Sequence, residues 1–132
     1  MPASLDSVTL VASDFVRSLA FYDAALAPLG LVRAAEFGDE EEDDAQLEAV
    51  GWADGDAPPQ LWLVSGANAT CGVHLRLRAQ SRAAVEAFFA AALRAGGVAS
   101  AEPRRWVVFR RGDFVAAVRD PEGNVVEAVA VE

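Results

Sequence analysis

The stretch DPEGN at residues 120–124, followed by VVEAVAV at residues 125–131, decides how the rest of the chain is interpreted. A segment rich in Pro, Gly and Asn followed by an apolar run predicts a tight turn and then a buried strand. Glu127 lies in the middle of that run. Burying a carboxylate costs several kcal/mol unless a cation, a metal or hydrogen-bond donors meet it. Another segment of the chain must therefore supply a partner for Glu127.

Outward from that strand, hydrophobic periodicity indicates the same order of elements twice, a strand, a helix and then further strands. In the first half we expect strands at 4–12, 31–37, 45–52 and 60–65, and a helix from residue 15 to about 29. In the second half we expect a helix from 82 to about 93 and strands at 72–78, 98–101, 106–110, 114–119 and 124–131. The helices begin after the capping candidates Ser13 or Asp14 and Ser81, and glycines end them. A hairpin turn is expected at Gly112-Asp113.

This repeat predicts an α+β protein made of two βαβββ modules, at residues 1–66 and 67–132. A chain of 132 residues with 53% hydrophobic content can bury one core. Because no linker separates the modules, we expect a single domain.

Composition excludes several classes of partner. The net charge of -9 argues against nucleic acid and anionic membrane surfaces, which are bound through Lys and Arg. The acidic run at 39–44 fits a solvated loop better than a cation site, because consecutive like charges lack ligand geometry. A single cysteine, Cys71, cannot form an internal disulfide, and MPASLDSVTL lacks the pattern of a signal peptide. We therefore expect a soluble cytoplasmic protein with an inert thiol.

Three segments together resemble the superfamily of glyoxalases, bleomycin resistance proteins and extradiol dioxygenases, also called vicinal oxygen chelate proteins. They are LDSVTLVASDFVRSLAFYDAALAPLGL, GVHLRLRAQSRAAVEAFFAAALRAGG and FVAAVRDPEGNVVEAV. The resemblance implies an open, cup-shaped barrel of two βαβββ modules, a small organic ligand in the cup and a homodimer. In metal-using members, inward side chains hold a divalent ion such as Zn, Ni, Mn or Fe.

Carried over to this chain, the family's metal-ligand positions fall on Ser7, on Gln60 or Trp62, on His74 and on Glu127. The resemblance gives His74 and Glu127 as metal ligands, and Glu127 as the catalytic residue if the protein is an enzyme. Ser7 stands where metal-using relatives carry His, and a serine hydroxyl is a poor ligand for these metals. The metal set is therefore incomplete.

Alternation along the strands offers Glu127 another partner. If His74 faces the cup, Arg76 and Arg78 share its face, and Glu127 lies on the matching face of the last strand. We hypothesise that Arg76, whose guanidinium can grip a carboxylate with two hydrogen bonds, or His74 pairs with Glu127 in place of a metal.

Further side chains are expected to face the cup, namely Trp62, Trp106, Val108, Phe114 and Ala116. An apolar and aromatic interior with a few charges is typical of a small-molecule pocket. The residues expected to bind the ligand are Ser7, Trp62, His74, Arg76, Trp106 and Phe114.

Two functions follow from the sequence. Ser7 favours a metal-independent protein that holds a small organic ligand in its cup. The alternative is a metal-dependent lyase or dioxygenase that acts on vicinal oxygens of a small substrate and completes the metal set with water or substrate oxygens. The sequence names neither the ligand nor the pairing mode of the dimer.

Overall fold

The computed structural model describes residues 2–38, 47–108 and 111–131. The first half contains β1 (Val8–Ala12), α1 (Phe15–Leu26), the 3₁₀ helix η1 (Ala27–Leu29), β2 (Val32–Gly38), β3 (Leu47–Ala53) and β4 (Leu61–Ser65). The second half contains β5 (His74–Ala79), α2 (Arg82–Arg94), β6 (Val98–Val108), β7 (Arg111–Arg119) and β8 (Val125–Val131). The α+β class and the repeated βαβββ order expected from the sequence are confirmed. The expected acidic loop at 39–44 lies outside the described residues.

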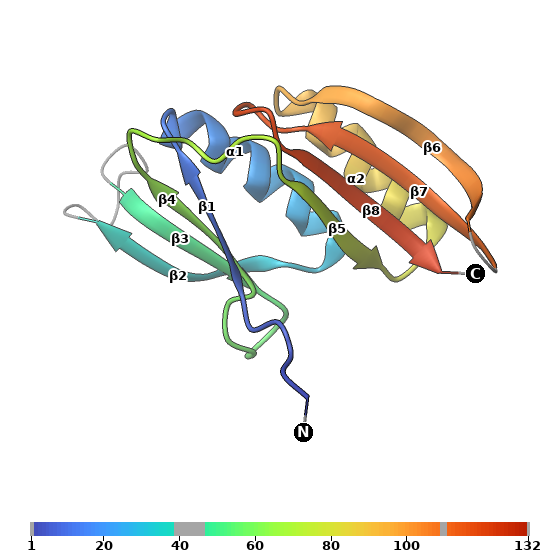
Figure 1. Ribbon diagram of the computed structural model, residues 1–132, viewed down its shortest axis with the longest axis horizontal. Coiled ribbons are helices and arrows are strands. Elements are labelled where there is room, and N and C mark those ends of the chain that lie inside the picture. The colour runs from blue at the N-terminus through green and yellow to red at the C-terminus, as the bar shows by residue number, and fades with distance from the viewer. Residues whose placement is uncertain (1, 39–46, 109–110, 132) are drawn as a thin grey trace.

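The described strands form two four-stranded sheets with equivalent orders, β1-β4-β3-β2 and β5-β8-β7-β6. In each sheet the first strand pairs in parallel with the last, and the other pairs are antiparallel. The sheets lie side by side, and both helices lie behind them (Figure 1). This arrangement leaves β1 and β5 as neighbouring edge strands of separate sheets.

Helix α1 begins where the sequence predicts, but it ends at Leu26, and the last three residues of the predicted helix form the 3₁₀ helix η1. The Asp14 carboxylate accepts a hydrogen bond from the Arg17 backbone N–H at 3.3 Å, which satisfies one donor of the first turn. Apolar side chains at helical spacing, such as Phe15 and Leu19, are buried. Gly30, with a φ of 82°, ends the segment in the left-handed conformation that glycine adopts without steric cost.

Helix α2 follows the same rules. The Ser81 hydroxyl accepts a hydrogen bond from the Ala84 backbone N–H at 3.1 Å, and Val85, Phe88 and Ala92 are buried. Leu93 is exposed. It lies at the end of the helix, beyond the stripe that packs on the sheet. No helix in the described part of the chain is long and apolar enough to cross a membrane.

The two halves share one hydrophobic cluster. It contains Leu19 and Trp52 from the first half and Phe88 and Val118 from the second. At Gly97, just after α2, an added Cβ would lie 2.6 Å from Phe21 Cε1 of α1 and also against Val118. The helices of the two modules therefore meet without space between them.

The second sheet differs from expectation at two points. The expected strands at 98–101 and 106–110 belong to one strand, β6, which runs through Pro103 with shifts in register. Proline has no backbone N–H to donate to a neighbouring strand. Because β6 is an edge strand with a single neighbour, Pro103 can be accommodated at a bulge without breaking the pairing of the sheet. The predicted turn at Gly112-Asp113 is wrong, since both residues lie within β7 and pair with Val107 and Trp106. Residues 109–110, which connect the strands, lie outside the described residues.

Candidate functional site

The face of both sheets opposite the helices, hereafter the open face, carries the charged residues expected in the cup. On β5, Leu75 and Leu77 pack toward the core while His74, Arg76 and Arg78 point the other way and are exposed. Arg76 lies opposite Glu127 of β8 in register. The alternation predicted for these strands is therefore confirmed.

Glu127 has two cationic or hydrogen-bonding partners on β5. Its Oε1 lies 2.8 Å from His74 Nε2 and 3.4 Å from Arg76 Nε. The Glu127 side chain is 13% exposed, whereas those of His74 and Arg76 are 60% and 53% exposed. The carboxylate thus lies deep in the sheet, and the imidazole of His74 and the guanidinium of Arg76 reach it from the solvent side. The hypothesis that Arg76 or His74 meets Glu127 is confirmed for both residues.

Arg76 also contacts a second carboxylate. Its Nη2 lies 3.6 Å from Asp113 Oδ2, so one guanidinium stands between Asp113 and Glu127. Both distances exceed those of a short hydrogen bond, and the side chain is half exposed. One guanidinium therefore lies against two carboxylates and offsets one of their two negative charges.

Part of the open face has an apolar floor. Val115, Ala117 and Val129 are buried although no helix covers this side of the sheet. The floor lies beside the Arg76 and Glu127 pair, in the second sheet.

A cavity of about 260 Å³ lies between the edge strands β1 and β5. Its apolar walls come from both modules and include Leu31, Leu61, Leu75 and Leu77. Ser7, Gln60 and Arg76 supply polar groups. Mostly apolar walls with a few convergent polar groups are typical of small-ligand sites. We refer to this space as the seam cavity.

The structure brings some predicted site residues together and keeps others apart. Ser7 and Arg76 line the same seam cavity. Trp62 lies on the open face of the first sheet, stacked on Phe37 with ring centroids 6.0 Å apart. Trp106 lies on the open face at the far edge of the second sheet, with the Arg104 guanidinium 4.4 Å from its ring.

The prediction that Phe114 and Ala116 face the cup is wrong. They lie opposite Ala130 and Ala128 on the face that packs against the helices, and the Arg82 guanidinium of α2 lies 4.9 Å from the Phe114 ring. Both faces of β7 are apolar, so alternation alone could not select the inward one. The side chain of Val108, expected on the same face as Trp106, lies outside the described part of the chain.

The donor atoms do not fit a metal held by three or more protein ligands. No group of three His, Cys, Asp or Glu side chains within the described residues could hold a metal ion. His74 Nε2 and Glu127 Oε1 lie 2.8 Å apart, and the Arg76 guanidinium lies beside the same carboxylate oxygen. A fixed cation at that position opposes the binding of a second one.

The DPEGN turn has a role that the sequence did not reveal. The buried Tyr22 hydroxyl of α1 donates to Asp120 Oδ2 at 2.5 Å, and Asp120 also accepts from the backbone and side chain of Asn124. Burial first, then the charge of Asp120, raises the pKa of Tyr22 far above its ordinary value, so the phenol stays a donor. The turn of the second module is therefore held by the helix of the first.

Two contacts between the modules, from Ser13 to Glu122 and from Val11 to Thr70, reinforce this connection, and a hydrogen bond within the second module holds Thr70. Glu122 Oε1 accepts from the Ser13 hydroxyl at 2.8 Å, and Asn124 Nδ2 donates to the Thr70 carbonyl at 2.8 Å. The Val11 backbone N–H of β1 in turn donates to Thr70 Oγ1 at 2.9 Å. Ser13 first, followed by other groups at the start of α1, lowers the pKa of Glu122.

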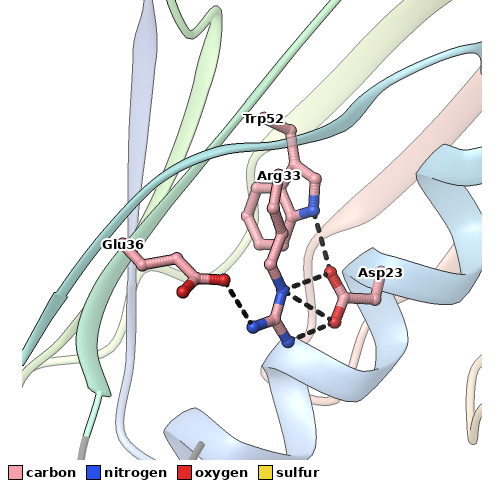
Figure 2. Close-up of polar contacts among 4 residues, drawn as sticks. All are labelled: Asp23, Arg33, Glu36 and Trp52. Carbon is pink, nitrogen blue, oxygen red and sulfur yellow. Dashed lines mark hydrogen bonds and ion pairs between the residues drawn. The ribbon is translucent and has the colours of Figure 1, made fainter. Parts of the chain in front are cut away.

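A second polar cluster, also missed from the sequence, joins α1 to β2 and β3 (Figure 2). Asp23 accepts from the Trp52 indole N–H at 3.0 Å and from Arg33 Nε at 3.0 Å, and Arg33 also contacts Glu36 at 3.0 Å. The cluster lies away from Glu127. We interpret it as a structural link between α1 and the first sheet.

Comparison with known proteins identifies the family of the chain. Residues 4–128 match the Glyoxalase/Bleomycin resistance protein/Dioxygenase superfamily. The chain belongs to this superfamily. A superfamily protein from Albidiferax ferrireducens T118, a glyoxalase/bleomycin resistance protein, is 27% identical, with a TM-score of 0.75 over 96% of this chain and 99% of that one. Among curated proteins, none matches the chain.

Two more distant solved structures show the same superfamily fold. A lactoylglutathione lyase from Agrobacterium tumefaciens is 20% identical, with a TM-score of 0.63 over 98% of this chain and 95% of that one. An antibiotic-binding protein, TnmS3 from Streptomyces sp. CB03234, is 18% identical, with a TM-score of 0.62 over 99% of this chain and 98% of that one. The fold thus occurs both in an enzyme and in a binding protein.

Proposed function

We propose that this protein binds a small organic molecule in the seam cavity and does so without a metal ion. The observation that carries the proposal is the position of Arg76. Its guanidinium meets the carboxylate of Glu127 at 3.4 Å and lines the seam cavity at the same time. The residue that neutralises the buried carboxylate is therefore also a candidate ligand contact.

The charge balance supports metal independence. In metal-using relatives the carboxylate at the position of Glu127 is implied to bind the ion, and its charge is offset by that ion. Here His74 and Arg76 reach the same oxygen from β5. A guanidinium stays protonated at all working pH values, so Glu127 has a permanent cationic partner within the chain.

The cavity supports ligand binding in preference to a purely structural role. The seam cavity has a volume of about 260 Å³. Its walls include leucines from β4, from β5 and from the segment before β2. β1 and β5, which border it, are edge strands and present backbone N–H and C=O groups on that side. A ligand with an apolar body and one polar end suits such a site.

Binding is tested with three probes of nearly equal shape, 3-phenylpropanol, 3-phenylpropionate and 3-phenylpropylammonium. Each is titrated by calorimetry into protein purified without a histidine tag and dialysed against EDTA. We expect saturable one-to-one binding of at least one probe. Ser7→Trp should abolish it by filling the cavity, whereas Ser4→Trp, on the exposed segment before β1, should not. Saturation by none of the probes would contradict the proposal, as would equal binding to both variants.

Metal independence is tested separately by measuring Zn, Ni, Mn and Fe per chain after purification and after addition of each metal. We expect less than stoichiometric metal and no change in probe affinity. The short distance between His74 and Glu127, 2.8 Å, favours the second candidate, a metal-dependent lyase or dioxygenase acting on vicinal oxygens. Stoichiometric metal that Glu127→Gln removes would establish that candidate in place of the metal-independent one.

A further inference from the structure

The segment Arg76-Leu77-Arg78 of β5 separates three cavities. Arg76 and Leu77 line the seam cavity, and both also line a neighbouring cavity of about 170 Å³ over Val129 and Val131. Leu77 and Arg78 line a third cavity of about 250 Å³. The two guanidinium groups are thus placed at the boundaries of the space that a ligand would occupy.

Arg78 differs from Arg76 in its charge environment. The two carboxylates on this part of the open face, Glu127 and Asp113, both contact Arg76. Arg78 is exposed and has no ion pair with any acidic residue in the described part of the chain, although Asp113 lines one of its two cavities and Asp54 the other. This uncompensated cation stands beside the cavities in a chain of net charge -9.

The acidic groups near the cavity do not offer an equivalent site for a cation. Glu127 is already met by His74 and Arg76, and Asp113 by Arg76. Asp6 lines the seam cavity but lies on the exposed segment before β1, where water solvates its charge. A ligand of negative charge is therefore favoured by Arg78 alone, the cation beside these cavities that is paired with no carboxylate in the described part of the chain.

We infer that the ligand is an organic monoanion, a carboxylate on a single-ring or short aliphatic body. This inference rests on the proposed function and names the class of ligand for the same site. The apolar body occupies the seam cavity between the leucines of the two modules. The carboxylate lies outside, between the guanidinium groups of Arg76 and Arg78, where planar N–H donors can pair with its two oxygens.

The experiment compares the three isosteric probes on the wild-type chain and on two charge variants, by calorimetry at low and moderate salt. We expect 3-phenylpropionate to bind more tightly than 3-phenylpropanol, and 3-phenylpropylammonium to bind most weakly. Arg78→Gln should weaken 3-phenylpropionate by about 3- to 10-fold and 3-phenylpropanol by a smaller factor, as expected for a partly solvated charge-assisted contact. Arg119→Gln, an exposed arginine of the same face that lines none of these cavities, serves as the control.

The outcomes separate this inference from the proposed function. Equal binding of the anion and the alcohol, or equal weakening by Arg78→Gln and Arg119→Gln, overturns the choice of an anion. The proposed function then still stands if the alcohol binds and Ser7→Trp removes that binding. Absence of binding for all three probes overturns both.

Discussion

Single residues on the open face show how a buried carboxylate is compensated. Alternation predicted that His74 and Arg76 would share a face with Glu127, and the register of β5 and β8 confirms it. The same reasoning could not foresee that Arg76 would also reach Asp113. The position of Asp113 depends on how β7 pairs with β6 and β8, which alternation within one strand does not determine.

Glu122 gives a prediction at the residue scale. Hydrogen bonds from Ser13 and the Asp14 backbone lower its pKa from the ordinary value of 4.5. A carboxyl group whose pKa is lower in the folded state stabilises the fold above its unfolded pKa and loses this contribution as the pH falls through the folded value. Wild type should therefore exceed Glu122→Gln in unfolding free energy at neutral pH, by less than about 1 kcal/mol because the group is largely solvated.

This difference is measured by urea denaturation across a pH series. It should remain constant above pH 4.5 and vanish as the pH falls below that value. Glu102→Gln, an exposed carboxylate of β6 with no hydrogen bond to α1, is the control and should show no such loss. A difference that grows toward acid pH would contradict the assignment.

At the scale of elements, polar contacts fix how α1 sits on the first sheet. Asp23 of α1 accepts from the indole N–H of the buried Trp52 and from the partly exposed Arg33 (Figure 2). These two contacts should differ in energy. A buried donor left without an acceptor loses its solvation, whereas a partly exposed ion pair contributes little.

We therefore expect Asp23→Ala to lower the free energy of unfolding by about 1–3 kcal/mol. Arg33→Ala should cost about 0–1 kcal/mol. Asp23→Asn keeps an oxygen for Trp52 and should fall between them. Urea denaturation measures all three, with Asp56→Ala in the exposed loop before β4 as the control. If Arg33→Ala costs as much as Asp23→Ala, the ion pair and not the indole contact fixes the helix.

At the scale of the whole molecule, the two modules depend on each other through one shared cluster and one clamp. The clamp consists of Tyr22, Thr70, Asp120 and Asn124, with the contact of Ser13 to Glu122 beside it. It joins the sheets near the end of β1, while the seam cavity lies near the beginning of that strand. Firm attachment at one end leaves space for a ligand at the other.

Gly97 tests the close packing between modules. An added methyl group would meet Phe21 of α1 at 2.6 Å, the Ala92 carbonyl at 2.9 Å and Val118. Because these neighbours belong to packed elements, Gly97→Ala should lower the free energy of unfolding by about 1–3 kcal/mol. Ser100→Ala, which is exposed three residues later, should be near neutral. A neutral Gly97→Ala in thermal and urea unfolding would show that the helices can separate there.

The sequence by itself determined the helices, their caps, the repeated βαβββ order and the face shared by His74, Arg76 and Arg78. These features follow from local periods of 3.6 and 2 residues and from capping chemistry, which neighbouring residues set.

Only the tertiary structure decided the rest. In the folded protein Phe114 lies toward α2, Gly112 lies within β7 and not in a hairpin turn, and Asp120 of the DPEGN turn accepts a hydrogen bond from Tyr22 of α1. Such features depend on register and on contacts between segments as far apart as Ser13 and Glu122, 109 residues along the chain. Side chains of a strand alternate between its two faces. Where both faces are apolar, as on β7, this alternation does not show which face points inward. The seam cavity likewise exists only because two edge strands from different modules are brought side by side.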